Sequence, residues 1–419
     1  MNPLYIDPGT GSALFSIAVG LATTVYFFSK HFWVWLKGRF ARASAVSVRV
    51  SGGERARIVL HSEGARYWNV FKPVVEELER RGVEARYLSM EESDPGLSSG
   101  HSRLKPSYIG TGDAAWARMR MLEADVCLTT TPGLDVYQFK RSRGVGHYAH
   151  ILHAVDDATS YRLFGLDYFD SVLLSGDYQS AAIRELEARR GLPAKALRVV
   201  GSTYLDVYAQ ELKTLAAGSR DGTTVLVSPS WGPSGILARH GMRLLEPLAR
   251  SGLELIVRPH PQSVKSETSM LDELRASLEP YANVEWDFGR ENLGSLSRAD
   301  VMISDFSGII FDYAFLFGRP VLHVAQDFDP RPYDASDVGE RPWKFRTVER
   351  IGRKLDSDDF PGIAELVASV RSDPMVAAAI AEAREEAWCH RGEAGARVAD
   401  FLMELSGSTG GGGRTDKRN

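Results

Sequence analysis

Short apolar runs alternate with amphipathic segments along the first half of the chain. Strands are expected at residues 57–61, 85–90, 125–129, 148–153, 171–174 and 197–200. Helical patterns lie between them: residues 70–81 stop at Gly82 and residues 179–190 stop at Gly191, and glycine is common directly after a helix. This alternation predicts an open α/β sheet.

A second alternating set begins near residue 223. Its expected strands are 224–227, 253–257, 284–286, 301–303 and 320–324, its expected helices are 236–250 and 270–278, and helical patterns run from 363 to 405. The pattern therefore predicts two α/β domains, at 51–205 and 206–405, and a disordered glycine-rich tail at 406–419. Doubly wound sheets bind ligands at the carboxyl ends of their strands, so we expect the two domains to face a cleft.

The N-terminal segment has a different pattern. Residues 11–29 carry no charge and, as a helix, would cover about 28 Å, close to the thickness of a bilayer core. An aromatic-rich patch follows at 32–36, and every charged residue from there to Arg49 is basic. We expect residues 1–50 to form a membrane anchor that leaves the rest on the cytoplasmic side of the cell membrane. A buried core helix and a cleaved signal peptide are the alternatives.

Composition narrows the classes of function. The 419 residues are 44% hydrophobic and 25% charged, which excludes global disorder. Against 54 acidic residues there are 50 basic ones, a net charge of −4 that gives no support for a nucleic-acid partner. The two cysteines, Cys127 and Cys389, lie far apart, which excludes a cysteine zinc cluster and fits a reducing compartment.

A rigid histidine follows the expected strand 253–257. In the sequence Arg258-Pro259-His260-Pro261 the two prolines exclude a helix around His260. Arg258 can pair with a phosphate through two hydrogen bonds. The alternative is a histidine that merely belongs to a stiff loop.

Residues 301–313 combine an apolar strand, a short polar turn and the start of an apolar helix. The N-terminus of a helix attracts anions, so Ser304, Ser307 and the Gly308 amide are candidates for holding a diphosphate. Simple capping of the helix is the alternative. Asp305 argues against a phosphate, because its charge would compete for the same amides.

Three histidines occur within residues 147–153. His153 falls at the end of the expected strand, beside a polar turn and two or three residues before an acid, and such a histidine can act as a general base. A structural role remains open. A metal site is disfavoured because residues three apart on a strand do not share a face. Ser230 and Trp231 follow the first strand of the second domain, where the tryptophan either stacks on a base or packs.

Motifs typical of P-loop NTPases, serine hydrolases, zinc proteases and NAD-dependent enzymes are absent. The chain instead resembles the CDP-glycerol glycerophosphotransferases, the family of teichoic-acid polymerases and primases. Four motifs carry the resemblance, in the same order as in the family, at residues 228–231, 258–261, 304–321 and 391–398. The N-terminal half is less similar: His153 stands where the family has the histidine of H-G-T-P, but Ala154 follows it here.

This resemblance implies a GT-B-like fold, in which two Rossmann-type domains face a cleft and the nucleotide binds the C-terminal one. It implies a transferase that displaces CMP from CDP-glycerol, or a similar CDP-alcohol, and adds glycerol phosphate to a hydroxyl of a lipid-linked or polymer acceptor in teichoic acid biosynthesis. His153 and His260 would be catalytic. Residues that would bind the donor are Arg258, Ser304, Ser307, Gly308, Ser230, Trp231 and Arg397.

None of the four motifs contains an acidic pair of D-x-D type, so we expect neither a metal ion nor a cofactor. Two rival hypotheses remain open. One is a GT-B glycosyltransferase that uses a nucleotide sugar. The other is a non-catalytic nucleotide-binding protein tethered to the membrane.

Overall fold

The computed structural model describes residues 29, 55–214, 222–289, 291–305, 307–324 and 329–408. Of the predicted membrane segment 11–29 only Ser29 is among them, so that prediction lies outside the described residues. Within the described ranges, no helix is both long and apolar enough to cross a bilayer.

The first domain is built on seven parallel strands in the order β3-β2-β1-β4-β5-β6-β7. Their bounds are β1 Ala56–Ser62, β2 Ala85–Ser89, β3 Leu104–Tyr108, β4 Glu123–Thr129, β5 Gly144–Ile151, β6 Ser171–Leu174 and β7 Ala196–Val199. The sequence did not predict β3, because this edge strand exposes four of its five residues and so lacks an apolar pattern. The other six strands were predicted within a few residues.

Four α-helices follow strands of the first domain: α2 Trp68–Arg80, α3 Gly112–Met119, α4 Ser180–Arg190 and α5 Thr203–Leu212. Val70, Phe71, Val74 and Leu78 form the buried face of α2. The predicted stop of α4 is confirmed, since Gly191 adopts a φ of 62°, a conformation that glycine reaches at little cost.

The second domain has six parallel strands in the order β10-β9-β8-β11-β12-β13. Their bounds are β8 Thr224–Val227, β9 Glu254–Val257, β10 Val284–Trp286, β11 Val301–Ser304, β12 Val321–His323 and β13 Gly352–Lys354. Its helices are α6 Ile236–His240, α7 Met242–Arg250, α8 Ser263–Ser266, α9 Thr268–Leu278, α10 Leu293–Arg298, α11 Ile309–Phe317, α12 Trp343–Arg350 and α13 Ile363–Arg371. The single helix predicted at 236–250 is two helices, because Gly241 at a φ of 42° separates them.

The C-terminal helices connect the domains. Helix α14 (Pro374–Ala387) packs on α11 and α12 of the second domain, whereas α15 (Ala394–Ser408) packs on α2 and β4 of the first. A side chain at Gly395 would collide with the backbone of Pro73, so the approach of α15 to α2 needs glycine. The predicted limits differ here: the last helix lies on the first domain, and residues 406–408 are helical instead of disordered.

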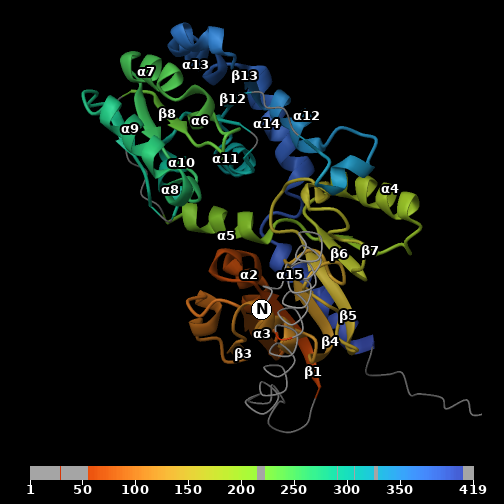
Figure 1. Cartoon of the computed structure of the whole chain (residues 1–419). Helices are drawn as coiled ribbons and strands as arrows, with labels where there is room; N and C mark the ends of the chain where they lie inside the picture. The colour runs from red at the N-terminus through yellow and green to blue at the C-terminus, as the bar shows by residue number, and fades with distance from the viewer. Residues whose placement is uncertain are drawn as a thin grey trace, which may run out of the picture.

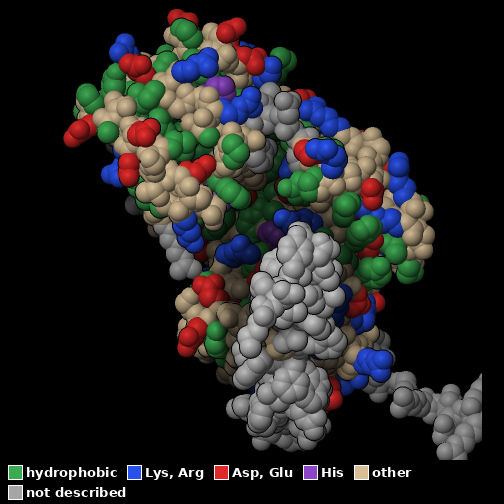
Figure 2. Space-filling model, in the orientation of Figure 1, with side chains coloured by type: hydrophobic (Ala, Val, Ile, Leu, Met, Phe, Trp, Pro, Cys, Tyr) green, Lys and Arg blue, Asp and Glu red, His purple; other side chains and the backbone are tan. Residues whose placement is uncertain are grey.

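Both sheets reverse their strand order at one point, between β1 and β4 in the first domain and between β8 and β11 in the second. Ligands of open α/β sheets bind at such points, outside the carboxyl ends of the strands. The two halves are joined by α5, which lies between them in Figure 1. In Figure 2 the surface is hollowed between the halves, with basic side chains and one histidine patch visible beside the hollow. The predicted α/β class with two parallel sheets is confirmed.

Candidate active site

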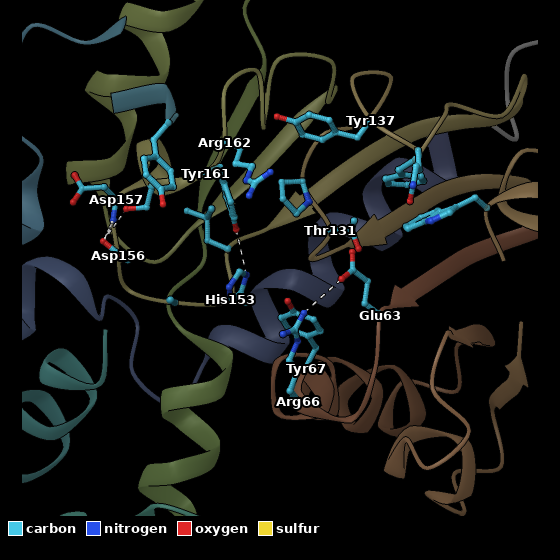
Figure 3. A pocket seen from close by; sticks show the side chains of 18 residues that line it. Glu63, Arg66, Tyr67, Thr131, Tyr137, His153, Asp156, Asp157, Tyr161 and Arg162 are labelled. Atoms are coloured by element: carbon cyan, nitrogen blue, oxygen red, sulfur yellow. Dashed lines mark hydrogen bonds and ion pairs between the residues drawn. The ribbon is translucent and has the colours of Figure 1, made fainter. Parts of the chain in front are cut away.

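A cavity of about 620 Å³ opens at the reversal point of the first sheet. Its lining comes mainly from segments that follow β1, β4 and β5, as Figure 3 shows, and one side chain, Tyr333, comes from the second domain. Glu63, Arg66 and Tyr67 follow β1, and His153 follows β5. The cavity thus combines aromatic, basic and imidazole groups in a first-domain position typical of ligand sites.

His153 lies in the wall of this cavity. The hydroxyl of Tyr161 is 3.3 Å from its Nδ1, and the ring of Tyr67 meets the imidazole edge-on with centroids 5.2 Å apart. The pKa of His153 is lowered to about 4, mainly by burial and also by the charge of Arg66, while the charge of Asp156 acts in the opposite direction. The ring is therefore neutral near pH 7, the state that a general base requires.

The two aspartates that follow His153 in the chain form contacts with the second domain. Asp156 lies 3.3 Å from the Lys344 ammonium, and the carboxylate of Asp157 accepts hydrogen bonds from the Trp343 and Lys344 amides at 2.7 and 2.8 Å. These amides begin α12, so Asp157 caps a helix of the other domain. Burial and the nearby Asp156 raise the pKa of Asp157 to about 6.

On the second domain, Asp305 organises the loops at the reversal point. Its carboxylate accepts hydrogen bonds from the backbone amides of Ser230 at 3.0 Å and Ile236 at 3.3 Å, which belong to the loop after β8 and the start of α6. The argument against a phosphate is therefore weaker than the sequence indicated, because these hydrogen bonds direct the carboxylate of Asp305 toward the loop after β8. Ser230 itself is buried, while Trp231 is 51% exposed.

The start of α11 is open to a ligand. Gly308 is the N-cap residue and is exposed, and a side chain built on it would meet no atom within 4 Å. Ser307 beside it is half-buried. The Ile310 and Phe311 amides already donate to the carbonyls of Ser307 and Gly308. The positive end of the α11 dipole favours an anion at this end.

Two residues that were predicted to bind the donor substrate have hydrogen-bond partners within the protein. The hydroxyl of Ser304 is fully buried and donates to the Ser228 carbonyl at 2.6 Å. The guanidinium of Arg258 is bound by the Asp287 carboxylate and donates to the Gly289 carbonyl at 2.8 Å. Both side chains therefore help to hold these loops in place, and their contact with a donor stays a prediction.

His260 is half-buried and oriented by its own loop. Its Nδ1 accepts the Gln262 amide at 3.0 Å, which leaves the hydrogen of the neutral ring on Nε2. Burial lowers the pKa of His260, while the charges of Asp305 and Glu267 raise it. The histidine thus lies near the loop after β11 and can donate a hydrogen bond from Nε2.

Arg397 lies elsewhere, because α15 belongs to the first domain, where its guanidinium pairs with Glu393 at 3.0 Å. The surrounding motif connects the domains: the carboxylate of Asp206 on α5 accepts the Gly392 amide at 2.8 Å and the Ala394 amide at 3.1 Å. In the structure this motif forms the start of α15, and a donor contact by Arg397 stays a prediction.

The predicted site residues form two groups. The second-domain group, around His260 and the start of α11, does not line the cavity that holds His153. Sequence reasoning missed Arg66, Tyr161 and Arg162, which do line it. Arg66 follows the expected strand 57–61 closely enough to have been noticed, whereas nothing in the loop that carries Tyr161 and Arg162 marks them.

A metal site was not expected. In the part of the chain that the structure describes, no group of three or more histidine, cysteine, aspartate or glutamate side chains is arranged to hold a metal ion.

Comparisons with known proteins agree with this geometry. Residues 245–336 match the family model described as CDP-glycerol:poly(glycerophosphate) glycerophosphotransferase. Among solved structures, the wall teichoic acid polymerase TagF soaked with CDPG has 13% identity and a TM-score of 0.57, over 92% of this chain and 99% of that one. No match was found among proteins with a curated description.

UDP-GlcNAc 2-epimerases have the same fold. The enzyme from Neisseria meningitidis bound to UDP-GlcNAc has 14% identity and a TM-score of 0.55, over 83% of this chain and all of that one. A putative one from Listeria monocytogenes has 13% identity and a TM-score of 0.58, over 84% and 97% of the two chains. The matched segment 245–336 contains His260 and the start of α11. The resemblance to the CDP-glycerol glycerophosphotransferase family is therefore confirmed over residues 245–336, and the chain as a whole has the GT-B-like fold of TagF and of the epimerases.

Proposed function

We propose that the chain transfers glycerol phosphate, or a related alditol phosphate, from a CDP-activated donor to a hydroxyl of a lipid-linked or polymer acceptor and releases CMP. The observation that carries this proposal is the family match over 245–336, because that segment includes both His260 and the start of α11 at the reversal point of the second sheet.

The donor diphosphate is assigned to the second domain. The first turn of α11, with Ser307 and Gly308, offers amides and the positive end of a helix dipole. His260 offers an Nε2–H that can hydrogen-bond the phosphate oxygens as charge develops on departing CMP. Trp231, half-exposed in the loop after β8, is available to stack on the base.

The acceptor hydroxyl is assigned to the first-domain cavity. His153 removes its proton while the oxygen attacks the phosphorus that carries glycerol; a bond from this oxygen to phosphorus forms, and the bond from phosphorus to CMP breaks. A pKa of about 4 makes free His153 a weak base. A bound diphosphate would place negative charge opposite the ring and raise its pKa toward the working pH.

We also propose that residues 1–50 hold the enzyme at the cytoplasmic face of the cell membrane, where a lipid-linked acceptor would be found. The support is the uncharged run 11–29 followed by basic residues.

The direct test is release of CMP from CDP-glycerol by the full-length protein with membrane lipids of the host. UDP- and GDP-sugars, offered in parallel, test the glycosyltransferase alternative. CDP-glycerol that binds but yields no CMP with any acceptor would point to the non-catalytic alternative. Activity should persist in EDTA, and a complete loss that Mg²⁺ or Mn²⁺ restores would refute a metal-free transfer.

A further inference from the structure

Tyr161 places a single hydroxyl between two imidazole rings at the edge of the cavity. Its oxygen lies 3.0 Å from Nε2 of His150 and 3.3 Å from Nδ1 of His153. His150 is fully buried on β5, so the sheet holds one end of this chain of three side chains. Figure 3 shows Tyr161 and His153 meeting beside the cavity.

The direction of these hydrogen bonds determines which nitrogen of His153 is free. A phenol has one hydrogen, so Tyr161 donates to one ring and accepts from the other. If it donates to His150, then His153 carries its hydrogen on Nδ1 and keeps a lone pair on Nε2. If it donates to His153, then Nε2 carries the hydrogen and cannot remove a proton from a substrate.

The proposed role of His153 selects the first direction. A general base needs a free lone pair, and Tyr161 faces Nδ1 of His153, so Nε2 is the nitrogen left to act. In this direction the neutral ring of His150 accepts at Nε2 from Tyr161 and carries its own hydrogen on Nδ1.

We propose that Tyr161 and His150 are positioning residues that hold His153 with its hydrogen on Nδ1 and its Nε2 lone pair free. This inference rests on the proposed role of His153 as the base. When Nε2 takes the proton of the acceptor hydroxyl, the Nδ1 hydrogen stays on the Tyr161 oxygen, and the phenol stays bonded to His150.

A neutral phenol thus occupies the place that a carboxylate often takes behind a catalytic histidine. The charged groups that act on His153 are Arg66 and Asp156, and Asp156 is paired with Lys344 of the second domain. Among the described residues, no hydrogen bond joins His153 to Arg66 or to Asp156.

The tautomer can be observed without any turnover. Full-length protein labelled with ¹⁵N-histidine should show, at pH 7, a hydrogen on Nδ1 of both His150 and His153, with the signals assigned from His150→Gln and His153→Asn. Tyr161→Phe should turn the His153 signal into that of mixed tautomers. A hydrogen on Nε2 of His153 in the unaltered protein would refute the proposal.

Kinetics provide the second readout. Tyr161→Phe should lower kcat by about 10- to 100-fold, less than the loss of an orienting carboxylate, with the KM for CDP-glycerol unchanged. His150→Gln keeps an acceptor for the phenol and should retain more activity than His150→Leu.

The matched control is Tyr148→Phe, which makes the same change at a buried tyrosine of β5 whose hydroxyl accepts the Ser142 amide. It should leave kcat within about twofold. If the unaltered protein releases no CMP, the proposed function fails. If it turns over normally and Tyr161→Phe matches Tyr148→Phe, only the positioning role is refuted.

Discussion

Ring nitrogens distinguish the two histidines of the cleft. In His260 the Gln262 amide occupies Nδ1, so the hydrogen is on Nε2 and the ring donates. In His153 the phenol of Tyr161 faces Nδ1, and the proposed arrangement leaves Nε2 to accept. The same side chain can therefore assist the leaving group on one domain and accept a proton on the other.

Alanine substitutions should separate these roles. His260→Ala should lower kcat by about 10²- to 10³-fold, as for a lost donor to developing charge, and weaken donor binding. His153→Ala should lower turnover by about 10²- to 10⁴-fold, the usual range for a general base, with donor affinity nearly intact. Donor affinity measured beside turnover tests both. Normal turnover of His153→Ala would show that another residue is the base. If His260→Ala changes neither turnover nor donor affinity, the assignment of the donor site to this loop is wrong.

The pH profile follows from the low pKa of His153. A base is active when deprotonated, and burial lowers this pKa from the ordinary 6.5 to about 4. kcat/KM reports the free enzyme, so it should stay level from pH 7 down to pH 5, where an ordinary histidine would be mostly protonated. Circular dichroism should confirm that the protein remains folded over this range. An acidic limb near pH 6.5 would contradict the assignment.

At the scale of elements, two helices carry the chain between domains. Helix α5 follows the last strand of the first sheet and ends before the first strand of the second sheet. Helix α15, at the C-terminal end of the described chain, packs on the first domain again. The Asp206 carboxylate on α5 accepts hydrogen bonds from the Trp388 indole at 2.9 Å and from two amides at the start of α15. The Asp206 carboxylate thus links α5 to the segment that joins α14 and α15.

Asp206→Ala should therefore destabilise the protein. It leaves a buried indole N–H and two amides without their acceptor, at a cost of about 1–3 kcal/mol for an unsatisfied group. Urea unfolding measures this loss. Gln210→Ala is the control on the same helix, because Gln210 is exposed and bonds only Lys213 among the described residues, and it should change stability by less than about 0.5 kcal/mol. Equal stability of the two variants would contradict the bridging role.

The N-terminal segment allows another test at this scale. Strand β1 begins at Ala56, so deleting residues 1–50 removes no described strand. We expect the shortened protein to stay folded and no longer to bind membranes, as flotation with vesicles would show. A product that is insoluble and unfolded would mean that the segment belongs to a core.

At the scale of the whole molecule, charged groups hold the two domains. Arg190 on α4 bonds Asp167 of its own domain at 2.7 Å and, on the second domain, Asp334 at 2.7 Å and Asp337 at 2.6 Å. Asp334 also accepts the Phe164 amide at 2.7 Å. These contacts fix the loop after β5, which carries the cavity wall, against the second domain.

Arg190→Leu should cost about 3–5 kcal/mol, the usual loss when one partner of a buried ion pair is removed, since Asp334 and Asp167 would keep buried charges. Thermal unfolding and small-angle scattering would report the loss of stability and a looser arrangement of the domains. Arg189→Leu is the matched control: that residue is exposed, pairs with Glu185 and should cost less than about 1 kcal/mol. A small effect of both substitutions would show that the network does not hold the domains.

Local patterns predicted much of the fold. Apolar strands and glycine stops such as Gly191 depend on neighbours in the chain, so most elements were predicted correctly. The short edge strands β3 and β13 were missed because exposed residues carry no apolar signal.

What the sequence by itself determined is the alternation of strands and helices, the two parallel sheets and the motifs of the second domain, because each depends on residues close together in the chain. Only the tertiary structure decided that Asp287 neutralises Arg258, that Ser228 binds Ser304, and that α15 lies on the first domain. It alone placed Tyr161 between two histidines. These partners are decided by strand order and packing, which bring together side chains that no local pattern relates.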